Sequence, residues 1–289
     1  MMKKNSCIFI SLAMSVVLFA CGGSSPSRQS KQSLRDSARY HASTHSVSKI
    51  YYSVPSPIEV AHVVQSTGVE YEARLLHKPE LGMRYSTNLA AALNLGIYGA
   101  DLSYSIYFDQ QQVALNYLDC IKELTSGLDI IDTTIAKKFI QIEENIRDKE
   151  KLKKVVNQTF FHSDALLKEN SRRPTAMLVA LGMWVECLYI STQLTNMDAA
   201  YNPQLTKCIV EQGLVFDDVQ GMLSILDETP DVDYVKKELE SVKSSFVNIN
   251  KSLGGTYVVS TEEFAVDSKL FTKLCDEVCK VRTNFTQLF

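Results

Sequence analysis

The chain has 289 residues, of which 45% are hydrophobic and 22% are charged. The N-terminal signal described below would remove two of its 30 basic side chains and none of its 33 acidic ones, so the remaining chain has a net charge of −5. This acidic balance argues against a nucleic-acid-binding protein, because such proteins meet phosphates with a basic face.

The first twenty residues carry the features of a bacterial lipoprotein signal peptide. Two lysines precede an apolar run over residues 8–20, which is too short to span a bilayer. The run ends in Leu-Phe-Ala-Cys at 18–21, which resembles a lipobox. We therefore expect residues 1–20 to be cleaved and Cys21 to be acylated with fatty acids such as palmitate. Bacterial lipoproteins normally carry three acyl chains, and stable anchoring needs more than one.

The segment after the lipobox reads as a lipidated, flexible tether over residues 21–55. It is rich in serine and poor in apolar residues until Ile50. It has neither an Asp next to the Cys nor an acidic cluster, so the expected location is the periplasmic face of the outer membrane. His41 and His45 lie four residues apart, but without the Glu of a zinc-binding HExxH motif they predict no metal site.

From Ser56 to residue 289 the apolar residues recur with a helical period, and no later segment has 18 consecutive apolar residues, so we expect a soluble body. Ser56-Pro57 predicts a helix start, and a second short helix is expected over 69–77. Only 257–259 looks extended. The longer helices are expected over 86–108, 111–126, 132–147, 149–169, 174–196, 204–227, 231–253 and 261–287. Because the connections are short, the sequence predicts an all-α, antiparallel helical bundle.

A faint internal repeat divides this body. With an offset of 86 residues, Gly96 aligns with Gly182, each after a leucine. Two related four-helix groups, roughly 85–170 and 171–256, would explain the matches. Leucine-rich helices also match by chance, so the sequence leaves both interpretations open.

The most distinctive helix contains two glycines, each costing about 1 kcal/mol relative to alanine. Gly96, Gly99, Ala100 and Ser103 recur at helical spacing and predict a smooth face that a neighbouring backbone approaches closely.

The same helix also offers a candidate ligand site. Asp101 has Tyr98 and Tyr104 three residues away on either side, so a carboxylate lies near two phenol rings. Trp184 and Glu186 stand near the matching place in the second half and would face the same groove. These five residues predict binding of a small polar ligand, with Asp101 at least partly buried.

This helix resembles one of the type Leu-Gly-x-Tyr-Gly-Ala-Asp-Leu, shared with a lipobox by a group of all-helical Bacteroidota lipoproteins. The resemblance covers most of the mature chain loosely and this helix more closely. It implies a location and a fold, and it brings no activity or site residue.

The remaining cysteines give no clear site. One cysteine leaves with the signal and Cys21 takes the lipid, so five remain, an odd number that leaves at least one thiol free or paired between molecules. These are Cys120, Cys187, Cys208, Cys275 and Cys279. The last two share a helix face, but no His lies near them, so we expect no metal site.

Three functions stay open at this point. The first is a binding or structural protein that holds a protein partner or a small polar ligand, with no cofactor and no nucleic acid. The second is an envelope-glycan enzyme, in which Asp101 would need a second acid roughly 5–9.5 Å away; Glu70, Glu72 and Glu186 are the candidates. The third is a helical-repeat scaffold with a concave face. The sequence has no Gly-x-Ser-x-Gly elbow, P-loop, Rossmann glycine fingerprint or HExxH motif, so no catalytic residue is assigned.

Overall fold

The computed structural model describes residues 56–170, 172–224, 226–257 and 265–289. The described residues belong to one compact unit. The predicted signal, Cys21 and the predicted tether lie outside the described residues.

The fold is all-α, as predicted, and the described residues contain no β-strand. Two short 3-10 turns, η1 (Ala73–Leu75) and η2 (Pro79–Arg84), separate the first helix from the rest. The α-helices are α2 (Pro57–Ser66), α3 (Asn88–Tyr107), α4 (Gln111–Gly127), α5 (Thr133–Glu144), α6 (Lys149–Glu169), α7 (Arg173–Leu194), α8 (Pro203–Leu223), α9 (Pro230–Ser252) and α10 (Ser268–Thr286).

Polar side chains cap the starts of several helices. Ser56 forms a reciprocal capping box with Glu59 at the start of α2. Thr87, Thr229 and Asp267 accept backbone N–H groups at the starts of α3, α9 and α10. Each cap satisfies an N–H group that has no partner within its helix, and so fixes where the helix begins.

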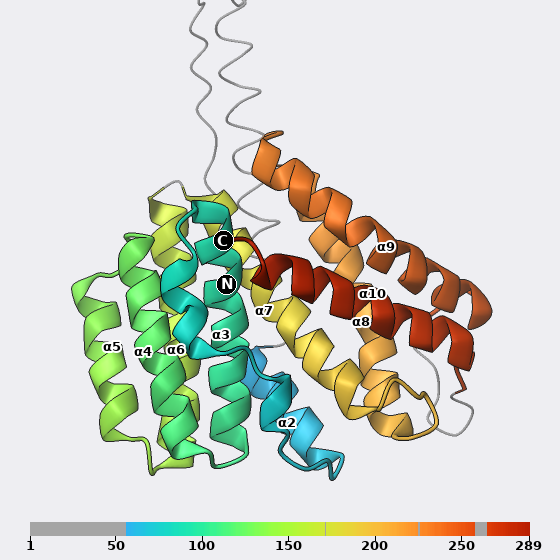
Figure 1. Cartoon of the computed structure of the whole chain (residues 1–289), viewed down its shortest axis with the longest axis horizontal. Helices are drawn as coiled ribbons and strands as arrows, with labels where there is room; N and C mark the ends of the chain where they lie inside the picture. Colours follow the sequence, from blue (N-terminus) through green and yellow to red (C-terminus); the bar gives the residue numbers. More distant parts are fainter. Residues whose placement is uncertain (1–55, 171, 225, 258–264) are drawn as a thin grey trace, which may run out of the picture. The chain divides into compact units, whose positions relative to one another are not determined.

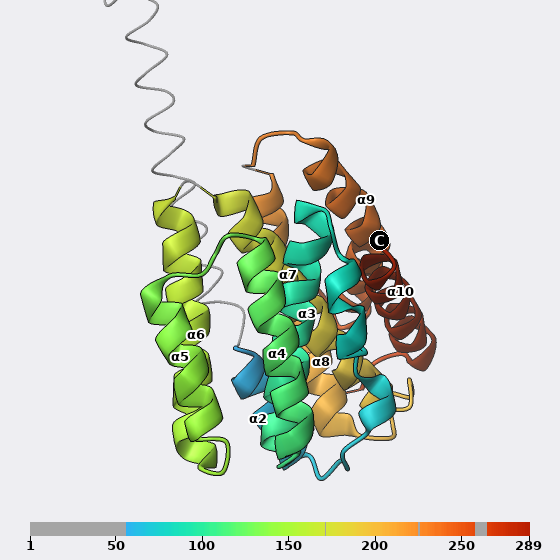
Figure 2. The ribbon, with the colours of Figure 1, turned by 60° about the vertical axis from the view of Figure 1, so that its left-hand side comes forward.

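Among the described residues, α3–α6 and α7–α10 form two sets of four helices that follow one another in the sequence (Figure 1). The second set ends with α10 at Thr286, beyond the predicted bound at 256. In the first set α3 contacts α4 and α6, and α5 contacts both α4 and α6. In the second set α7 contacts α8 and α10, and α9 contacts both α8 and α10. The two sets meet along α3 and α7 (Figure 2), which make the most extensive contact among the described helices. Helix α2 packs against both of them.

The two central helices are buried nearly all round. In α3 every residue from Ala90 to Tyr107 is buried, and α7 is buried over most of its length. By length and composition α7 is apolar enough to cross a membrane, but 89% of its most apolar window lies inside the fold. A helix that is apolar on all sides and surrounded by other helices is a core helix.

The segment predicted as a short helix over 69–77 is not one. It forms, with η2, an irregular strap over residues 69–85 that crosses α3. The backbone N–H of Glu72 donates to the Tyr104 hydroxyl (3.1 Å), and that of His77 donates to Oδ2 of Asp101 (3.1 Å). Side chains of α3 therefore take the place of the carbonyl partners that a helix would supply.

The C-terminal end of the fold also differs from expectation. The last helix begins at Ser268, later than the predicted 261. The predicted extended segment 257–259 is described only at Tyr257, which is buried against α8 and α9.

Candidate functional site

The glycines of α3 lie where helices approach closely, but they do not share one neighbour. A Cβ atom on Gly96 would lie 2.6 Å from the backbone nitrogen of Met183 and closer still to the Val179 carbonyl oxygen of α7. A Cβ on Gly99 would lie 2.6 Å from the Phe160 ring of α6. The two glycines predicted to share one smooth face therefore meet two different helices, α7 at Gly96 and α6 at Gly99.

The crossing of α3 and α7 is reciprocal. A Cβ on Gly182 would lie 2.8 Å from the carbonyl carbon of Leu93 and closer still to its oxygen. Gly96 meets Val179, and Gly182 meets Leu93, so the two contacts are related by the offset of 86 residues seen in the sequence.

Asp101 lies in a closed cluster of charged groups. Asp101 and Glu186 are both 0% exposed, and Arg282 of α10 donates to Glu186 through Nε (2.9 Å) and Nη2 (3.0 Å). Burial, together with the nearby Glu186 charge, raises the pKa of Asp101 well above its usual value, and Arg282 only partly opposes this. The cluster therefore combines Asp101, whose protonated form is favoured by burial, with a Glu186–Arg282 ion pair.

The aromatic residues around Asp101 hold the strap. The Tyr98 ring stacks on His77 (5.2 Å between centroids), and its hydroxyl donates to the Lys78 carbonyl (2.9 Å). The Tyr117 hydroxyl donates to the carbonyl of His77 (2.9 Å), and Nε2 of His77 lies 2.6 Å from the Tyr85 hydroxyl. Burial, with a smaller effect of Arg282, lowers the pKa of His77 to about 3, so the ring is neutral.

Tyr104 has a corresponding role at the other end of the strap. It accepts the Glu72 N–H and stacks on Tyr71 at 5.4 Å. The polar groups of α3 that were predicted to hold a ligand thus hold the protein's own backbone.

Of the three acids considered as a second carboxyl group near Asp101, only Glu186 lies in the same buried cluster. Glu70 and Glu72 lie on the strap, where Glu72 pairs with Arg74 and retains 37% of its side-chain exposure. Sequence reasoning missed His77, Tyr85, Tyr117 and Arg282. Tyr117 and Arg282 have partners that are distant in the chain, and His77 and Tyr85 lie in the irregular strap, so no helical spacing marks any of them.

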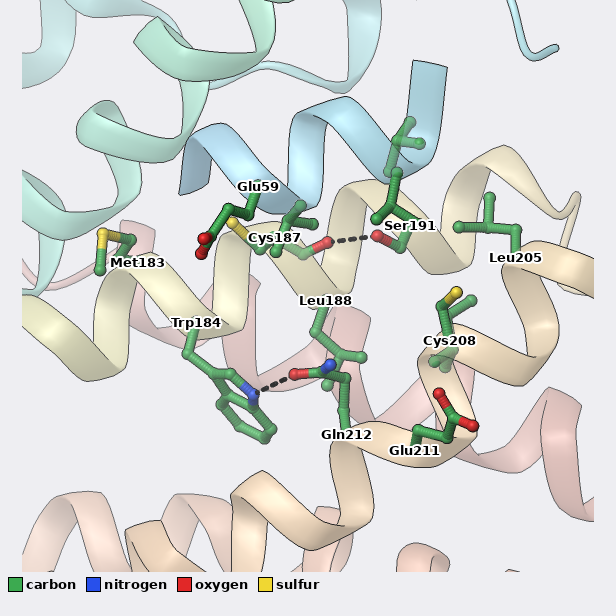
Figure 3. A pocket seen from close by; sticks show the side chains of 14 residues that line it. Glu59, Met183, Trp184, Cys187, Leu188, Ser191, Leu205, Cys208, Glu211 and Gln212 are labelled. Carbon is green, nitrogen blue, oxygen red and sulfur yellow. Dashed lines mark hydrogen bonds between the residues drawn. The ribbon is translucent and has the colours of Figure 1, made fainter. Parts of the chain in front are cut away.

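Trp184, the fifth predicted ligand residue, lies at a separate place. It lines an open pocket of about 220 Å³ between α2, α7 and α8 (Figure 3). Its indole N–H donates to Oε1 of Gln212 (3.2 Å), and its ring stacks on Phe216. None of the other four predicted residues is among those that line this pocket.

The pocket has apolar walls with a few polar groups. Its walls include Val60, Val63, Met183, Leu188, Leu205 and Ile209. The polar contributors are Glu59 from α2, Ser191 from α7, and Glu211 and Gln212 from α8. Of the residues that line the pocket, only Trp184 was predicted to bind a ligand, because the pocket joins helices that are far apart in the chain.

Two thiols face the same pocket. Burial raises the pKa of Cys187 above its ordinary value, with a further contribution from Glu186. Burial also raises the pKa of Cys208, with Glu211 contributing. Neutral thiols behave as small apolar groups, so these cysteines add to the walls rather than act as nucleophiles.

The five described cysteines are all free thiols. Within the described part of the chain, no group of three or more His, Cys, Asp or Glu side chains could hold a metal ion.

Comparison of the chain with protein-family models, with curated proteins and with solved structures gave no match.

Proposed function

We propose that this protein is a lipid-anchored binding protein of the bacterial envelope that takes up a small, largely apolar ligand between α2, α7 and α8. The observation that carries the proposal is the pocket beside Trp184. It combines apolar walls with a few polar groups, which is the composition typical of small-molecule sites.

The size of the pocket restricts the ligand. An apolar cavity of about 150 Å³ in another protein takes up benzene. At about 220 Å³ this pocket suits a somewhat larger body, such as one ring with a short alkyl chain. Larger ligands would have to extend through its open side.

The Asp101 cluster supports a structural role better than a catalytic one. Asp101 and Glu186 are fully buried, and Arg282 and the strap occupy the positions around them. A glycosidase needs two carboxyl groups that both reach a sugar bound between them. The cluster instead joins α3, α7, α10 and the strap.

The proposed location depends on the sequence. The lipobox predicts an anchor at Cys21, and residues 22–55 would link that anchor to α2. A flexible chain of this length spans roughly 30 Å. The body would thus work close to the membrane surface, on the periplasmic face of the outer membrane, and its resemblance to the Bacteroidota lipoproteins agrees with this proposal.

The pocket can be tested with the protein's own fluorescence, because Trp184 is the single tryptophan of the chain. Phenylbutanol, a neutral probe of suitable size, should cause a saturable change in Trp184 emission in the full chain carrying Cys21→Ser, which prevents acylation. Cys208→Phe, which fills the pocket, should abolish this change. Leu214→Phe adds the same side chain at an exposed position of the same helix, and the change in Trp184 emission should persist in this variant. A linear, non-saturating response would refute the binding site.

The anchor has its own test. Cells fed an alkyne-labelled palmitate should label the wild-type protein, and Cys21→Ala should abolish the labelling. Labelling that survives in Cys21→Ala would refute the proposed anchor.

A further inference from the structure

We infer that the ligand of the pocket between α2, α7 and α8 is an organic ammonium ion, with an apolar body between the helices and its cationic head beside Glu59 or Glu211. This inference rests on the proposed function, since it specifies the chemistry of the ligand that the pocket would bind.

The charge of the walls is the first argument. Among the described residues that line the pocket, Glu59 and Glu211 are acidic, and none is Lys, Arg or His. Glu59 projects from α2 and Glu211 from α8, so carboxylates come from two different walls (Figure 3). A fatty acid or other anion would find no positive partner in the lining, whereas a cation would find a negative one on either side.

The hydrogen-bonding groups of the pocket also favour a cationic ligand. The Ser191 hydroxyl donates to the Cys187 carbonyl (2.7 Å), and the Trp184 indole donates to Gln212. These two donors are therefore engaged within the protein. Carboxylates only accept hydrogen bonds when they are ionised, and an ammonium group offers three donors and no acceptor.

Glu59 and Glu211 already have hydrogen-bond or ion-pair partners, but both carboxylates can accept further hydrogen bonds. Oε2 of Glu59 accepts the Ser56 N–H at 2.7 Å, and a carboxylate has room for about four such bonds. Glu211 lies 3.9 Å from Lys207, at the edge of ion-pair distance, and its side chain is 36% exposed. Lys207 is not one of the residues that line the pocket.

A series of three probes with one apolar body tests the inference. Phenylbutylammonium, phenylbutanol and phenylbutanoate carry a positive, a neutral and a negative head, and Trp184 emission reports the affinity of each in the full chain with Cys21→Ser. We expect the ammonium probe to bind about tenfold tighter than the alcohol, the difference expected for one charge-assisted hydrogen bond at a partly exposed carboxylate. The carboxylate probe should bind most weakly.

Substitutions identify the group responsible. Glu59→Gln or Glu211→Gln should reduce the ammonium affinity towards that of the alcohol, while the affinity for the alcohol changes less than about twofold. Glu228→Gln, a change of the same kind outside the pocket lining, is the control and should leave the tenfold preference intact. The preference should also shrink as salt is added.

The outcomes separate the two proposals. If the alcohol or the carboxylate binds as tightly as the ammonium probe, or if neither glutamine variant reduces the preference, the inference is refuted and the binding pocket stands. If none of the three probes binds, the proposed function itself is wrong.

Discussion

An alanine at the α3–α7 crossing should destabilise the protein, although alanine is the better helix former. In Gly96→Ala the new Cβ would lie 2.6 Å from the Met183 nitrogen, where ordinary contact begins near 3.4 Å. The obstructing atoms belong to the backbone of a buried helix, so no side chain can rotate away. The two helices would have to separate by at least about 0.8 Å, which is the difference between these two distances.

The cost can be estimated from this geometry. Overpacking a close-packed core costs about 1–3 kcal/mol, and the backbone contact places this site at or above the upper end. The better helix propensity of alanine offsets about 1 kcal/mol of this loss in the free energy of unfolding. We therefore expect a net loss of about 2–3 kcal/mol in the free energy of unfolding for Gly96→Ala, and a similar loss for Gly182→Ala. In a unit of this size the melting temperature should fall by roughly 4–12 °C.

Urea and thermal unfolding followed by far-ultraviolet circular dichroism would measure the effect. Gly221→Ala in α8 is the matched control, because a Cβ there would meet nothing within 4 Å. This control should gain about 0.5–1 kcal/mol. Once the helices have separated for one Cβ, the second should cost less, so the double variant should lose less than the sum of the two single losses. If Gly96→Ala and Gly182→Ala are as stable as Gly221→Ala, the close crossing is refuted.

Three further predictions concern the buried charges and the pocket. Arg282→Met leaves Glu186 buried without its partner and should cost about 3–5 kcal/mol in unfolding experiments, while adding Glu186→Leu should recover most of this loss. The pKa of His77 is about 3 in the folded state and 6.5 for the free group, so between these pH values the folded state binds fewer protons than the unfolded state, and stability should fall as the pH drops. The loss of stability from about pH 7 to about pH 4 should be smaller in His77→Gln than in the wild type. Equal losses would contradict the buried neutral ring. Asp101 acts in the opposite direction, since its raised pKa favours the folded state at low pH, and so the comparison with His77→Gln is needed to isolate the histidine. Phenylbutanol should slow alkylation of Cys187 and Cys208, measured by mass spectrometry, and equal rates with and without the probe would argue against binding between α7 and α8.

Much of the fold follows from local signals in the sequence. Most of the long helices begin and end within a few residues of the predicted bounds, because their apolar periodicity and their capping residues are local properties. The strap over residues 69–85 could not be predicted in this way. Its apolar spacing suits a helix, but its backbone N–H groups find partners on α3, and such tertiary hydrogen bonds leave no periodic pattern.

The site was harder to predict than the fold. The sequence correctly pointed to Asp101 as a buried group, but the partner of Glu186 is Arg282, which lies 96 residues further along the chain. Helical periodicity shows which residues share a face, and it does not show which helix covers that face. Trp184 was grouped with Asp101 for this reason, although it lies in a separate pocket on α7.

The charge cluster and the pocket are linked through α7. Glu186 and Cys187 are neighbours in sequence, yet Glu186 meets Arg282 while Cys187 lines the pocket together with Trp184. Neighbouring residues on an α-helix differ by about 100° around its axis, so fixing the direction of Glu186 also fixes the wall that α7 presents to α8. Replacing a buried ion pair with apolar residues can leave stability unchanged, but it removes this directional constraint. The variant Arg282→Met with Glu186→Leu should therefore unfold at nearly the wild-type denaturant concentration and yet bind phenylbutanol more weakly. Unchanged affinity in this stable variant would show that the ion pair does not shape the pocket.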